Sequence, residues 1–419
     1  MMKEYRKISH LDIEYSLANL KQLVFEVTDA CNLRCKYCAY ADLYEGYDQR
    51  ENLKLPFQKA KLIIDYLYEY WEKRYCIEVN DPITIGFYGG EPLLNVPFIQ
   101  QVINYIESLN PIGKKFHYNM TTNAILLDRY MDFLAENEFR LLISLDGDEK
   151  GQSYRVDTKG KNSFDKVLAN IQLLRSKYPS YFEHYVMFNS VLHNRNEVES
   201  TYRFIKDKFG KEPMISPLNN SGVRKDKLQE FYQAYQNVAT SIQKANNCEA
   251  LKNELFIKSP ETGALVNYIY HHTGNVFNDY NDLLLGREGS SFPPSGTCIP
   301  FSKKMFITVK GRILQCEKID HEFALGQITN KKVELNLEQA ARQHNKYTFR
   351  YMNQCKTCAA KQLCTQCVYQ IDDIHDKTSK CYSYYSATQH EKQKEYYMDH
   401  LDKHPELYNR ILKEVVVRG

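Results

Sequence analysis

The chain has 419 residues, 43% of them hydrophobic, which is enough for two or three domains with substantial cores. Its 55 basic and 52 acidic residues leave a formal net charge of +3, so no overall field favours nucleic acid or a membrane surface as a partner. The opening MMKEYRKISHLDIEY lacks the apolar core of a signal peptide, and no apolar run approaches the roughly 20 residues of a transmembrane helix. These features predict a cytoplasmic protein without nucleic-acid or membrane partners.

The first half of the sequence alternates β-rich runs with helical patterns, which predicts an α/β fold. The runs LVFEVT, PITIGFY, KFHYNMTT, LLISLD, HYVMFNSVL and PMISPL predict six strands that begin at residues 23, 82, 115, 141, 184 and 213. Amphipathic patterns predict helices over 56–73, 96–109, 128–136, 163–177 and 196–207. Alternating strands and helices imply a parallel sheet that curls into a full or partial barrel, with its chemistry at the carboxyl ends of the strands.

The second half has a different character. Residues 221–290 are expected to be a bridging helical insertion that includes a polar helix, KDKLQEFYQAYQNVATSIQKANN. The run KKMFITVKGRILQCEKI predicts a hairpin with its turn at Lys310 and Gly311. The expected division is 1–220 as the barrel, 221–290 as the insertion, 291–383 as a small cysteine-rich domain, and 384–419 as a charged helical tail exposed to solvent.

Ten of the twelve cysteines lie in two groups. Because disulfides are disfavoured in a reducing compartment, grouped thiols there more often bind metal or carry out redox chemistry. The first group, Cys31, Cys35 and Cys38 in CNLRCKYC, permits three interpretations: one face of a buried helix, a zinc site, or an iron–sulfur cluster. A cubane cluster needs four ligands, so three cysteines leave one iron open to a ligand from outside the protein.

The C-x3-C-x2-C motif, with Tyr37 before its last cysteine, resembles the signature of radical S-adenosylmethionine (SAM) enzymes. Three further segments resemble motifs of this family at successive strand ends. They are FYGGEPLL, MTTNA, in which Ala124 replaces the family's glycine, and ISLDG. The segment YRVDTKGKNSFDKVLANI resembles the family's segment whose arginine holds the SAM carboxylate. Together these motifs cover residues 23–215 and imply a partial (β/α)6 radical SAM barrel.

The resemblance also implies cofactors and residue roles. SAM would chelate the open iron, and reduction of the cluster would cleave SAM to a 5′-deoxyadenosyl radical that takes hydrogen from the substrate. Arg155 would bind the SAM carboxylate, because a guanidinium suits a carboxylate bidentately, and Tyr37 would lie near the adenine. The residues assigned to SAM binding are Tyr37, Gly89, Gly90, Glu91, Asn123, Ser144 and Arg155.

The second group comprises Cys298, Cys316, Cys355, Cys358, Cys364, Cys367 and Cys381. The run CKTCAAKQLCTQC separates its two C-x2-C pairs by five residues, whereas a zinc ribbon has about 15–20. The region instead resembles the SPASM domain of some radical SAM enzymes, which holds one or two auxiliary [4Fe–4S] clusters, although that family's run ends in C-x3-C.

The SPASM resemblance implies how these cysteines pair, and it gives three [4Fe–4S] clusters in all. One auxiliary cluster would be held by Cys355, Cys358, Cys364 and Cys381, and the other by Cys298, Cys316 and Cys367. The second set has three ligands, so its fourth iron is either open or bound by another residue such as Cys76 or Cys248. A zinc-binding domain is the alternative.

SPASM enzymes commonly act on peptides and proteins, so the resemblance implies an oxidoreductase with a peptide substrate. The main hypothesis is a maturase that installs a thioether or C–C crosslink in a ribosomally made precursor peptide, supplied with electrons by a flavodoxin or ferredoxin. The first alternative is an anaerobic sulfatase-maturing enzyme that forms formylglycine. Glu317, which follows Cys316 where that family has Asp, would be the general base.

A third hypothesis, a non-catalytic iron–sulfur or zinc protein, explains the cysteines but not the motifs at the strand ends. About 22 residues precede the first predicted strand, so no leader-binding domain is expected before the barrel. Leader recognition is instead expected to use the insertion, the cysteine-rich domain or a separate leader-binding protein.

Overall fold

The computed structural model describes residues 5–72, 82–109, 115–273, 294–361 and 364–415. The chain divides into two compact units. The barrel unit contains Ser9–Ser241 and Cys298–Arg342, and the terminal unit contains Met1–Ile8, Ile242–Thr297 and Gln343–Gly419. The expected four-part division of the chain stays a prediction.

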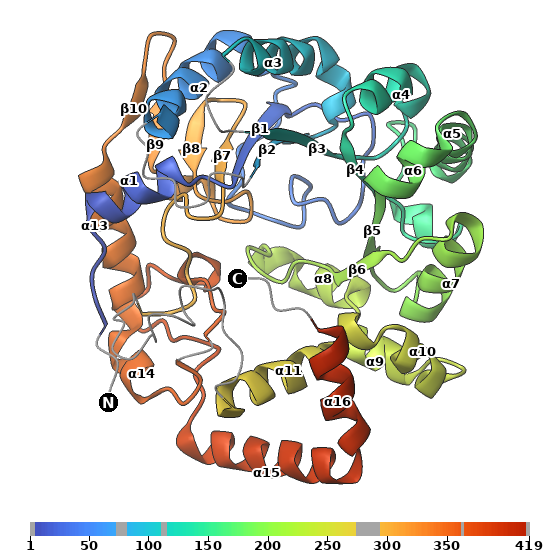
Figure 1. The fold of residues 1–419 in the computed structure, drawn as a ribbon, viewed down its shortest axis with the longest axis vertical. Helices are drawn as coiled ribbons and strands as arrows, with labels where there is room; N and C mark the ends of the chain where they lie inside the picture. The colour runs from blue at the N-terminus through green and yellow to red at the C-terminus, as the bar shows by residue number, and fades with distance from the viewer. Residues whose placement is uncertain (1–4, 73–81, 110–114, 274–293, 362–363, 416–419) are drawn as a thin grey trace. The chain divides into compact units, whose positions relative to one another are not determined.

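Among the described residues, one ten-stranded sheet runs through the barrel unit in the order β10-β9-β8-β7-β1-β2-β3-β4-β5-β6 (Figure 1). Strands β1 to β6 are parallel throughout, as the alternating pattern predicts. The strands are β1 (Gln22–Thr28), β2 (Ile83–Gly89), β3 (Phe116–Thr122), β4 (Arg140–Ser144), β5 (Val186–Leu192), β6 (Met214–Pro217), β7 (Met305–Ile307), β8 (Arg312–Leu314), β9 (Gly326–Ile328) and β10 (Val333–Leu335).

Helices connect the parallel strands and line the outer side of their arc (Figure 1). The α-helices of the first half are α1 (His10–Ala18), α2 (Phe57–Glu72), α3 (Val96–Leu109), α4 (Leu127–Glu136), α5 (Phe164–Lys177), α6 (Pro179–Tyr185) and α7 (Val198–Phe209). Those that follow are α8 (Leu228–Ala234), α9 (Val238–Gln243), α10 (Cys248–Glu254), α11 (Pro260–Thr273), α13 (Leu337–Thr348), α14 (Met352–Thr357), α15 (Ala387–Lys403) and α16 (Pro405–Glu414). No helix among the described residues is long and apolar enough to cross a membrane.

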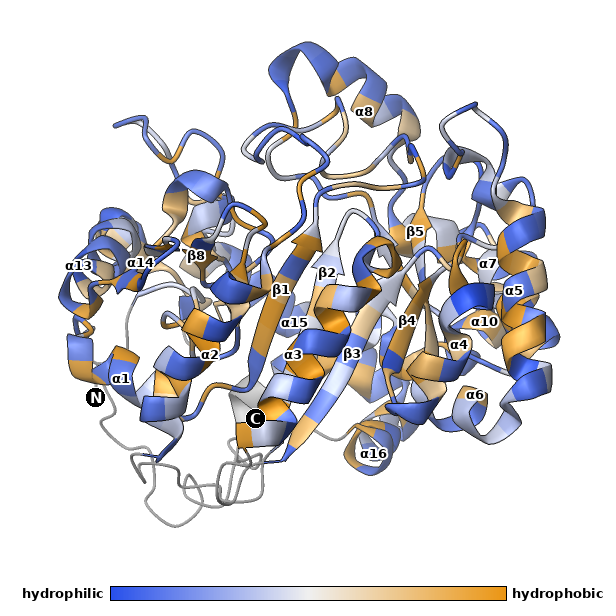
Figure 2. Ribbon diagram, turned by 90° about the horizontal axis from the view of Figure 1, so that it is seen from above, coloured by the Kyte–Doolittle hydropathy of each residue, from blue (hydrophilic) through white to orange (hydrophobic). Residues whose placement is uncertain are grey.

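The six predicted strands and five predicted helices of the first half are confirmed to within about two residues at each end. Their signal is strong because strands such as β1 are buried almost throughout, and Figure 2 shows β1 as a hydrophobic strand. The predicted hairpin is confirmed as β7 and β8, with Gly311 in the turn at a φ of +89°. The sequence did not predict that β7 also joins the sheet, in parallel beside β1.

The prediction of a single polar helix after β6 is wrong. The segment forms a short 3-10 turn (Lys225–Lys227), then α8 and α9, with a break at Tyr235. Tyr235 has extended backbone and pairs with His193 in a β-bridge, and the carbonyl of Ala234 accepts a hydrogen bond from the amide of Asn194. Tertiary pairing with the loop after β5 therefore overrides the local helical preference.

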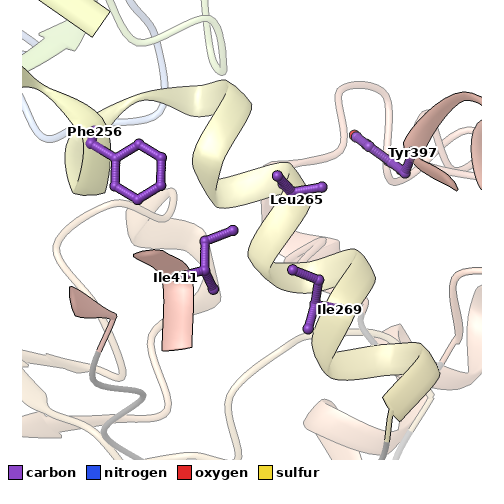
Figure 3. Packing of buried hydrophobic residues seen from close by; sticks show 5 residues of the cluster. All are labelled: Phe256, Leu265, Ile269, Tyr397 and Ile411. Carbon is purple, nitrogen blue, oxygen red and sulfur yellow. The ribbon is translucent and has the colours of Figure 1, made fainter. Parts of the chain in front are cut away.

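The sequence predicted a helical tail that is exposed to solvent, but part of this tail is buried. Tyr397 of α15 and Ile411 of α16 are buried against Phe256 and against Leu265 and Ile269 of α11, in the terminal unit (Figure 3). The tail also breaks at His404, which precedes Pro405, into two helices. Charged residues dominate the tail, so the few apolar positions that pack against α11 were difficult to recognise from composition.

We predict that Ile411→Ala opens α16 locally, whereas Leu412→Ala does not. Ile411 is 4% exposed and Leu412 is 55% exposed, although the two are neighbours on the same helix. Truncation of a buried isoleucine costs about 2–4 kcal/mol, and truncation of an exposed leucine changes stability by about 0.5 kcal/mol or less. Hydrogen exchange of the α16 amides measures the difference. Equal exchange in the two variants would contradict the packing in Figure 3.

Candidate functional site

The three cysteines of CNLRCKYC lie in the loop that follows β1, so the interpretation as one face of a helix is wrong. Cys31, Cys35 and Cys38 are partly exposed and form no disulfide. All three line one cavity of about 420 Å³ that opens to solvent. Three free thiols around one cavity fit a cubane cluster that keeps one iron for an outside ligand.

Backbone hydrogen bonds brace this cysteine loop against residues 154–157. The amide of Arg34 donates to the carbonyl of Val156 over 2.7 Å, and the amide of Lys36 donates to the carbonyl of Tyr154 over 3.0 Å. These bonds join segments that are distant in the sequence. The spacing of the cysteines therefore does not by itself determine the shape of the loop.

Gly89 and Gly90 are required by the packing of β2 against β1. A Cβ atom on Gly89 would overlap the carbonyl oxygen of Thr28, and one on Gly90 would overlap that of Ala30. Gly89 also has a φ of +132°, which L-residues rarely adopt. The amides of Gly90 and Glu91 donate to these two carbonyl oxygens over 2.9 Å. The glycines thus bring the end of β2 against the start of the cysteine loop, and their approach to SAM stays a prediction.

Glu91 is buried, and both of its carboxylate oxygens accept hydrogen bonds within the protein. One oxygen accepts from the hydroxyl of Thr122 over 2.7 Å and from the amide of Leu93 over 3.2 Å, and the other accepts from the amide of Asn123 over 2.8 Å. Burial raises the pKa of Glu91 to about 7, although these donors lower it. Glu91 therefore ties the end of β2 to the end of β3, and a contact with SAM stays a prediction.

Asn123 lies beside the first cysteine. Its side-chain nitrogen is 2.7 Å from the side-chain oxygen of Asn32 and 3.7 Å from the sulfur of Cys31. Its side-chain oxygen accepts a hydrogen bond from the amide of Ile125 over 3.0 Å. Ala124 has a φ of +61°, so the left-handed turn after β3 is kept although alanine replaces the family's glycine. The structure therefore brings this predicted residue to the cluster site.

A buried ion pair lies next to Tyr37. The carboxylate of Asp146, just beyond β4, accepts hydrogen bonds from Nε of Arg155 over 2.9 Å and from Nη2 over 3.1 Å. The Tyr37 hydroxyl donates to the same carboxylate, and the Arg155 guanidinium lies 5.3 Å from the centre of the Tyr37 ring. The expected contact of Arg155 with the SAM carboxylate stays a prediction, and it depends on Nη1, the nitrogen that Asp146 does not engage. Ser144 is buried at the last position of β4, and its contact with SAM also stays a prediction.

The charges of this cluster affect one another strongly. Burial alone raises the pKa of Asp146, but the Arg155 guanidinium, His193 and Tyr37 outweigh burial and lower that pKa to about 2. Burial also raises the pKa of the Cys35 thiol to about 12, although Arg155 counteracts it. Asp146 is therefore charged at neutral pH, and its charge is matched inside the protein by Arg155.

Sequence reasoning missed His193, which directly follows β5. It is fully buried, with Nε2 3.7 Å from the Asp146 carboxylate, and its ring centre lies 5.5 Å from that of Tyr37. Its Nδ1 accepts a hydrogen bond from the amide of Arg195 over 3.2 Å, which places a proton on Nε2, facing Asp146. Asp146 and His193 stand at the carboxyl ends of adjacent parallel strands, and this position was the signal that could have identified them.

The start of the expected insertion pairs with the cysteine loop and borders the same cavity. The amide of Glu45 donates to the carbonyl of Gly222, and the amide of Arg224 donates to the carbonyl of Leu43. At the rim of the cavity, Lys227 pairs with Asp42 over 2.7 Å, and Lys36 pairs with Glu230 over 3.5 Å. These exposed ion pairs contribute little stability. They do place α8 and the residue before it at the cavity mouth.

Four C-terminal cysteines meet at a second pocket, in the terminal unit. The residues that line the pocket include Cys355, Cys358, Cys364 and Cys381. They form no disulfide, and they are the four that the sequence assigned to one auxiliary cluster. Tyr5 also lines this pocket, and its hydroxyl donates to the carbonyl of Cys355 over 3.1 Å. A four-thiol pocket fits a fully ligated cubane.

The remaining cysteines are divided between the two units. Cys298 and Cys316 belong to the barrel unit, and Cys367 belongs to the terminal unit. Burial raises the pKa of the Cys316 thiol, with a smaller contribution from the neighbouring Glu317, to about 12. Cys76 lies outside the described residues, so it is not compared with the others. The assignment of Cys298, Cys316 and Cys367 to one cluster stays a prediction.

Glu317, the predicted general base, is held in an ion pair. Both of its carboxylate oxygens lie 3.0 Å from Nζ of Lys304, and the two side chains are largely shielded from solvent. The ammonium group engages both oxygens that a base would offer to a substrate proton. The role of Glu317 as the general base stays a prediction, in which a substrate proton would compete with Lys304 for the carboxylate.

Comparisons with known proteins show what these features are similar to. Residues 25–205 match the model of the Radical SAM superfamily. The cysteine-type anaerobic sulfatase-maturating enzyme of Clostridium novyi (strain NT) is 26% identical over 360 residues, which cover 83% of this chain and 87% of that protein. The radical SAM cyclopropyl synthase TigE of Paramaledivibacter caminithermalis is 25% identical over 194 residues, 45% of this chain and 38% of that protein.

The fold is also similar to that of solved structures. Native anSMEcpe with bound AdoMet and Cp18Cys peptide matches with a TM-score of 0.59 over 93% of this chain and 98% of that chain, at 19% identity. A likeness at that identity shows the fold alone. The superfamily match covers β1 to β5 and therefore includes all three cysteines of the first cavity and the polar strand ends around them. Residues 25–205 are therefore similar to the radical SAM domain of that superfamily.

Proposed function

We propose that this radical SAM enzyme modifies a side chain of a peptide or protein. The observation that carries the proposal is that Cys31, Cys35 and Cys38 line one cavity, with Asn123, just after β3, 3.7 Å from the sulfur of Cys31. Its support comes from the similarity to a sulfatase-maturating enzyme over 83% of this chain, because the name of that relative describes action on another protein.

In the proposed mechanism, the three cysteines hold a [4Fe–4S] cluster. With SAM bound and one electron from a reductant, such a cluster would supply the radical chemistry that removes a hydrogen atom from a carbon of the substrate. The role of Tyr37 is to present its ring to the adenine, because Asp146 fixes its hydroxyl. The role of Arg155 is to hold the carboxylate of SAM through the nitrogen that Asp146 leaves free.

The second pocket would hold an auxiliary cluster on Cys355, Cys358, Cys364 and Cys381. Such a cluster supplies an acceptor or relay for an electron. A second auxiliary cluster on Cys298, Cys316 and Cys367 is part of the same proposal. A flavodoxin or ferredoxin is the proposed low-potential donor, and a separate protein is proposed to present the leader of the substrate.

Formation of a thioether or C–C crosslink in a precursor peptide is the product that we favour. Such a crosslink removes two hydrogen atoms from the peptide, and one leaves as the abstracted atom. The other leaves as a proton and an electron, for which the auxiliary cluster would be the acceptor. Two observations support this product over formylglycine: Lys304 engages Glu317 at the position of the expected base, and one relative is named a cyclopropyl synthase, an enzyme that closes C–C bonds.

Formylglycine formation is the second candidate. The similarity to the cysteine-type sulfatase-maturating enzyme over most of both chains favours it. It would require Glu317 to leave Lys304 and take a proton from the substrate. The two candidates differ in their product, since only formylglycine contains an aldehyde.

The first prediction concerns cofactor content. After anaerobic reconstitution with iron and sulfide, we expect about twelve iron atoms per chain, four in each of three clusters. We also expect SAM-dependent formation of 5′-deoxyadenosine under a strong reductant. The triple variant Cys31→Ala, Cys35→Ala, Cys38→Ala should lose about four iron atoms and all SAM cleavage. Bound zinc without SAM cleavage in the unmodified protein would overturn the proposal.

The second prediction separates the two products. We expect the reconstituted enzyme to form no aldehyde on the Cp18Cys peptide, because Lys304 engages Glu317. Trapping with a hydrazide reagent and mass spectrometry detect the aldehyde, with anSMEcpe, whose solved structure holds this peptide, as the positive control. Aldehyde on the peptide after incubation with this enzyme would establish formylglycine formation and exclude the crosslink as its main reaction.

The third prediction concerns Asp146→Asn. Loss of the carboxylate leaves the Arg155 guanidinium buried without its partner, which costs on the order of 3 kcal/mol. We expect weaker SAM binding and a lower unfolding midpoint in denaturant, and little change for Asp132→Asn, whose pair with Lys177 is exposed. In the unmodified protein, the contribution of Asp146 should be complete above about pH 4 and disappear as the pH falls towards about 2, because folding lowers the pKa of Asp146. Equal stability of the two variants would contradict this account.

A further inference from the structure

Arg50 contacts a cysteine of the first cavity directly. Its Nη2 donates a hydrogen bond to the sulfur of Cys38 over 3.2 Å. Its guanidinium also lies 4.6 Å from the centre of the Tyr40 ring, and both residues line the cavity. No family motif singled out this arginine in the sequence, and the proposed function has not used it.

The backbone beside Arg50 and the guanidinium group of Arg50 each have a contact of their own. The next residue, Glu51, donates its amide to Asp29 over 2.8 Å, and its carboxylate pairs with Lys310 over 2.5 Å. The Tyr40 ring supports the guanidinium itself. An arginine that is fixed in this way loses little further freedom when it bonds a sulfur.

One donor of Arg50 has no protein partner. Its Nε is buried, and no hydrogen bond to it exists among the described residues. A buried guanidinium nitrogen without an acceptor is costly. Sulfur atoms of a cluster held by Cys38 would be acceptors close to this group. The orientation of Arg50 therefore suits a loaded site better than an empty one.

We infer that Arg50 raises the reduction potential of the SAM-binding cluster through its N–H···S hydrogen bond to Cys38 and its positive charge. This inference rests on the proposed cluster at Cys31, Cys35 and Cys38. One-electron reduction adds negative charge to the cluster. A cation at 3.2 Å from a ligand sulfur stabilises the reduced form more than the oxidised form. Arg50 is thus a positioning and charge-supplying residue that makes the cluster easier to reduce.

Arg34 provides a matched control on the same loop. It also lines the cavity, but its Nη1 donates to the backbone carbonyls of Cys31 and Leu33 over 2.9 and 3.1 Å. Its side chain is exposed, so water and salt screen its charge. Both arginines therefore add a positive charge near the cysteines. Among the described residues, Arg50 donates a hydrogen bond to a cysteine sulfur, whereas Arg34 donates to backbone carbonyls.

The test is a redox titration of the reconstituted full-length enzyme, followed by electron paramagnetic resonance of the reduced cluster. A variant in which Cys298, Cys316, Cys355 and Cys358 are all replaced by alanine serves as the background, so that the signals of the two proposed auxiliary clusters do not overlap. We expect Arg50→Gln to shift the midpoint potential to a more negative value, Arg50→Lys to shift it less, and Arg34→Gln to leave it unchanged within error. An unchanged potential in Arg50→Gln would overturn the inference.

A second measurement does not depend on the loss of charge. The background enzyme is labelled with arginine that carries ¹⁵N in its guanidinium group, and pulsed resonance detects nitrogen coupled to the reduced cluster. We expect a coupling that disappears in the labelled Arg50→Lys protein, and a coupling that persists would overturn the inference. The proposed function fails in a different way, since the unmodified enzyme would then show neither a cluster signal that responds to SAM nor 5′-deoxyadenosine.

Discussion

The buried ion pair between Asp146 and Arg155 is the interaction on which the geometry of the proposed SAM site depends. Two charges without water are tolerated only when they neutralise each other and their remaining donors and acceptors are satisfied. Asp146 meets this condition by accepting bonds from Arg155, Tyr37 and the amide of Val191. Through these partners, a single carboxylate fixes the end of β4, the end of β5 and the aromatic residue of the cysteine motif.

The same pair also determines the shape of the cysteine loop. Arg155 lies in residues 154–157, whose carbonyl groups accept the amides of Arg34 and Lys36. Displacement of Arg155 would therefore disturb both the SAM pocket and the loop that holds the proposed cluster. Glu91 plays a comparable part on the opposite side, where it joins β2 to β3 beside the first cysteine. Two buried carboxyl groups with opposite pKa shifts thus lie on the two sides of the site. The pKa of Asp146 is lowered to about 2, so Asp146 stays charged at neutral pH, whereas the pKa of Glu91 is raised to about 7.

Three cationic side chains of the barrel unit have different partners, and this difference shapes the functional proposals. Arg155 is committed to Asp146, Lys304 is committed to Glu317, and Arg50 is turned towards a cysteine sulfur. A family motif assigns a role to Arg155, and Lys304 is important because it pairs with the predicted base, Glu317. The third is recognisable only from its contact. Each proposal rests on which partner a charged side chain has, because in a poorly solvated site an ion pair changes what its members can do.

The order of elements was predictable, because parallel strands buried on both faces leave long apolar runs and the helices between them leave a 3.6-residue period. The cysteine motif and the strand-end motifs were predictable for the same reason: they are local in sequence. The break in the polar helix was not predictable, because it depends on the pairing of Tyr235 with His193, which is distant in the sequence. The buried positions of the tail were hidden as well, because a few apolar residues such as Ile411 are enough when α11 supplies the opposite face.

The sequence by itself determined the radical SAM barrel and the cysteine ligands proposed for its cluster, since each follows from residues that are close together in the chain. Only the tertiary structure decided the partners of the charged groups. In that structure Arg155 pairs with Asp146, and His193 lies beside this pair. Glu317 pairs with Lys304, and Arg50 donates a hydrogen bond to Cys38. Ion pairs and hydrogen bonds join atoms that are neighbours in space, and their partners lie on different strands and loops. No periodicity or spacing along one segment encodes such a choice.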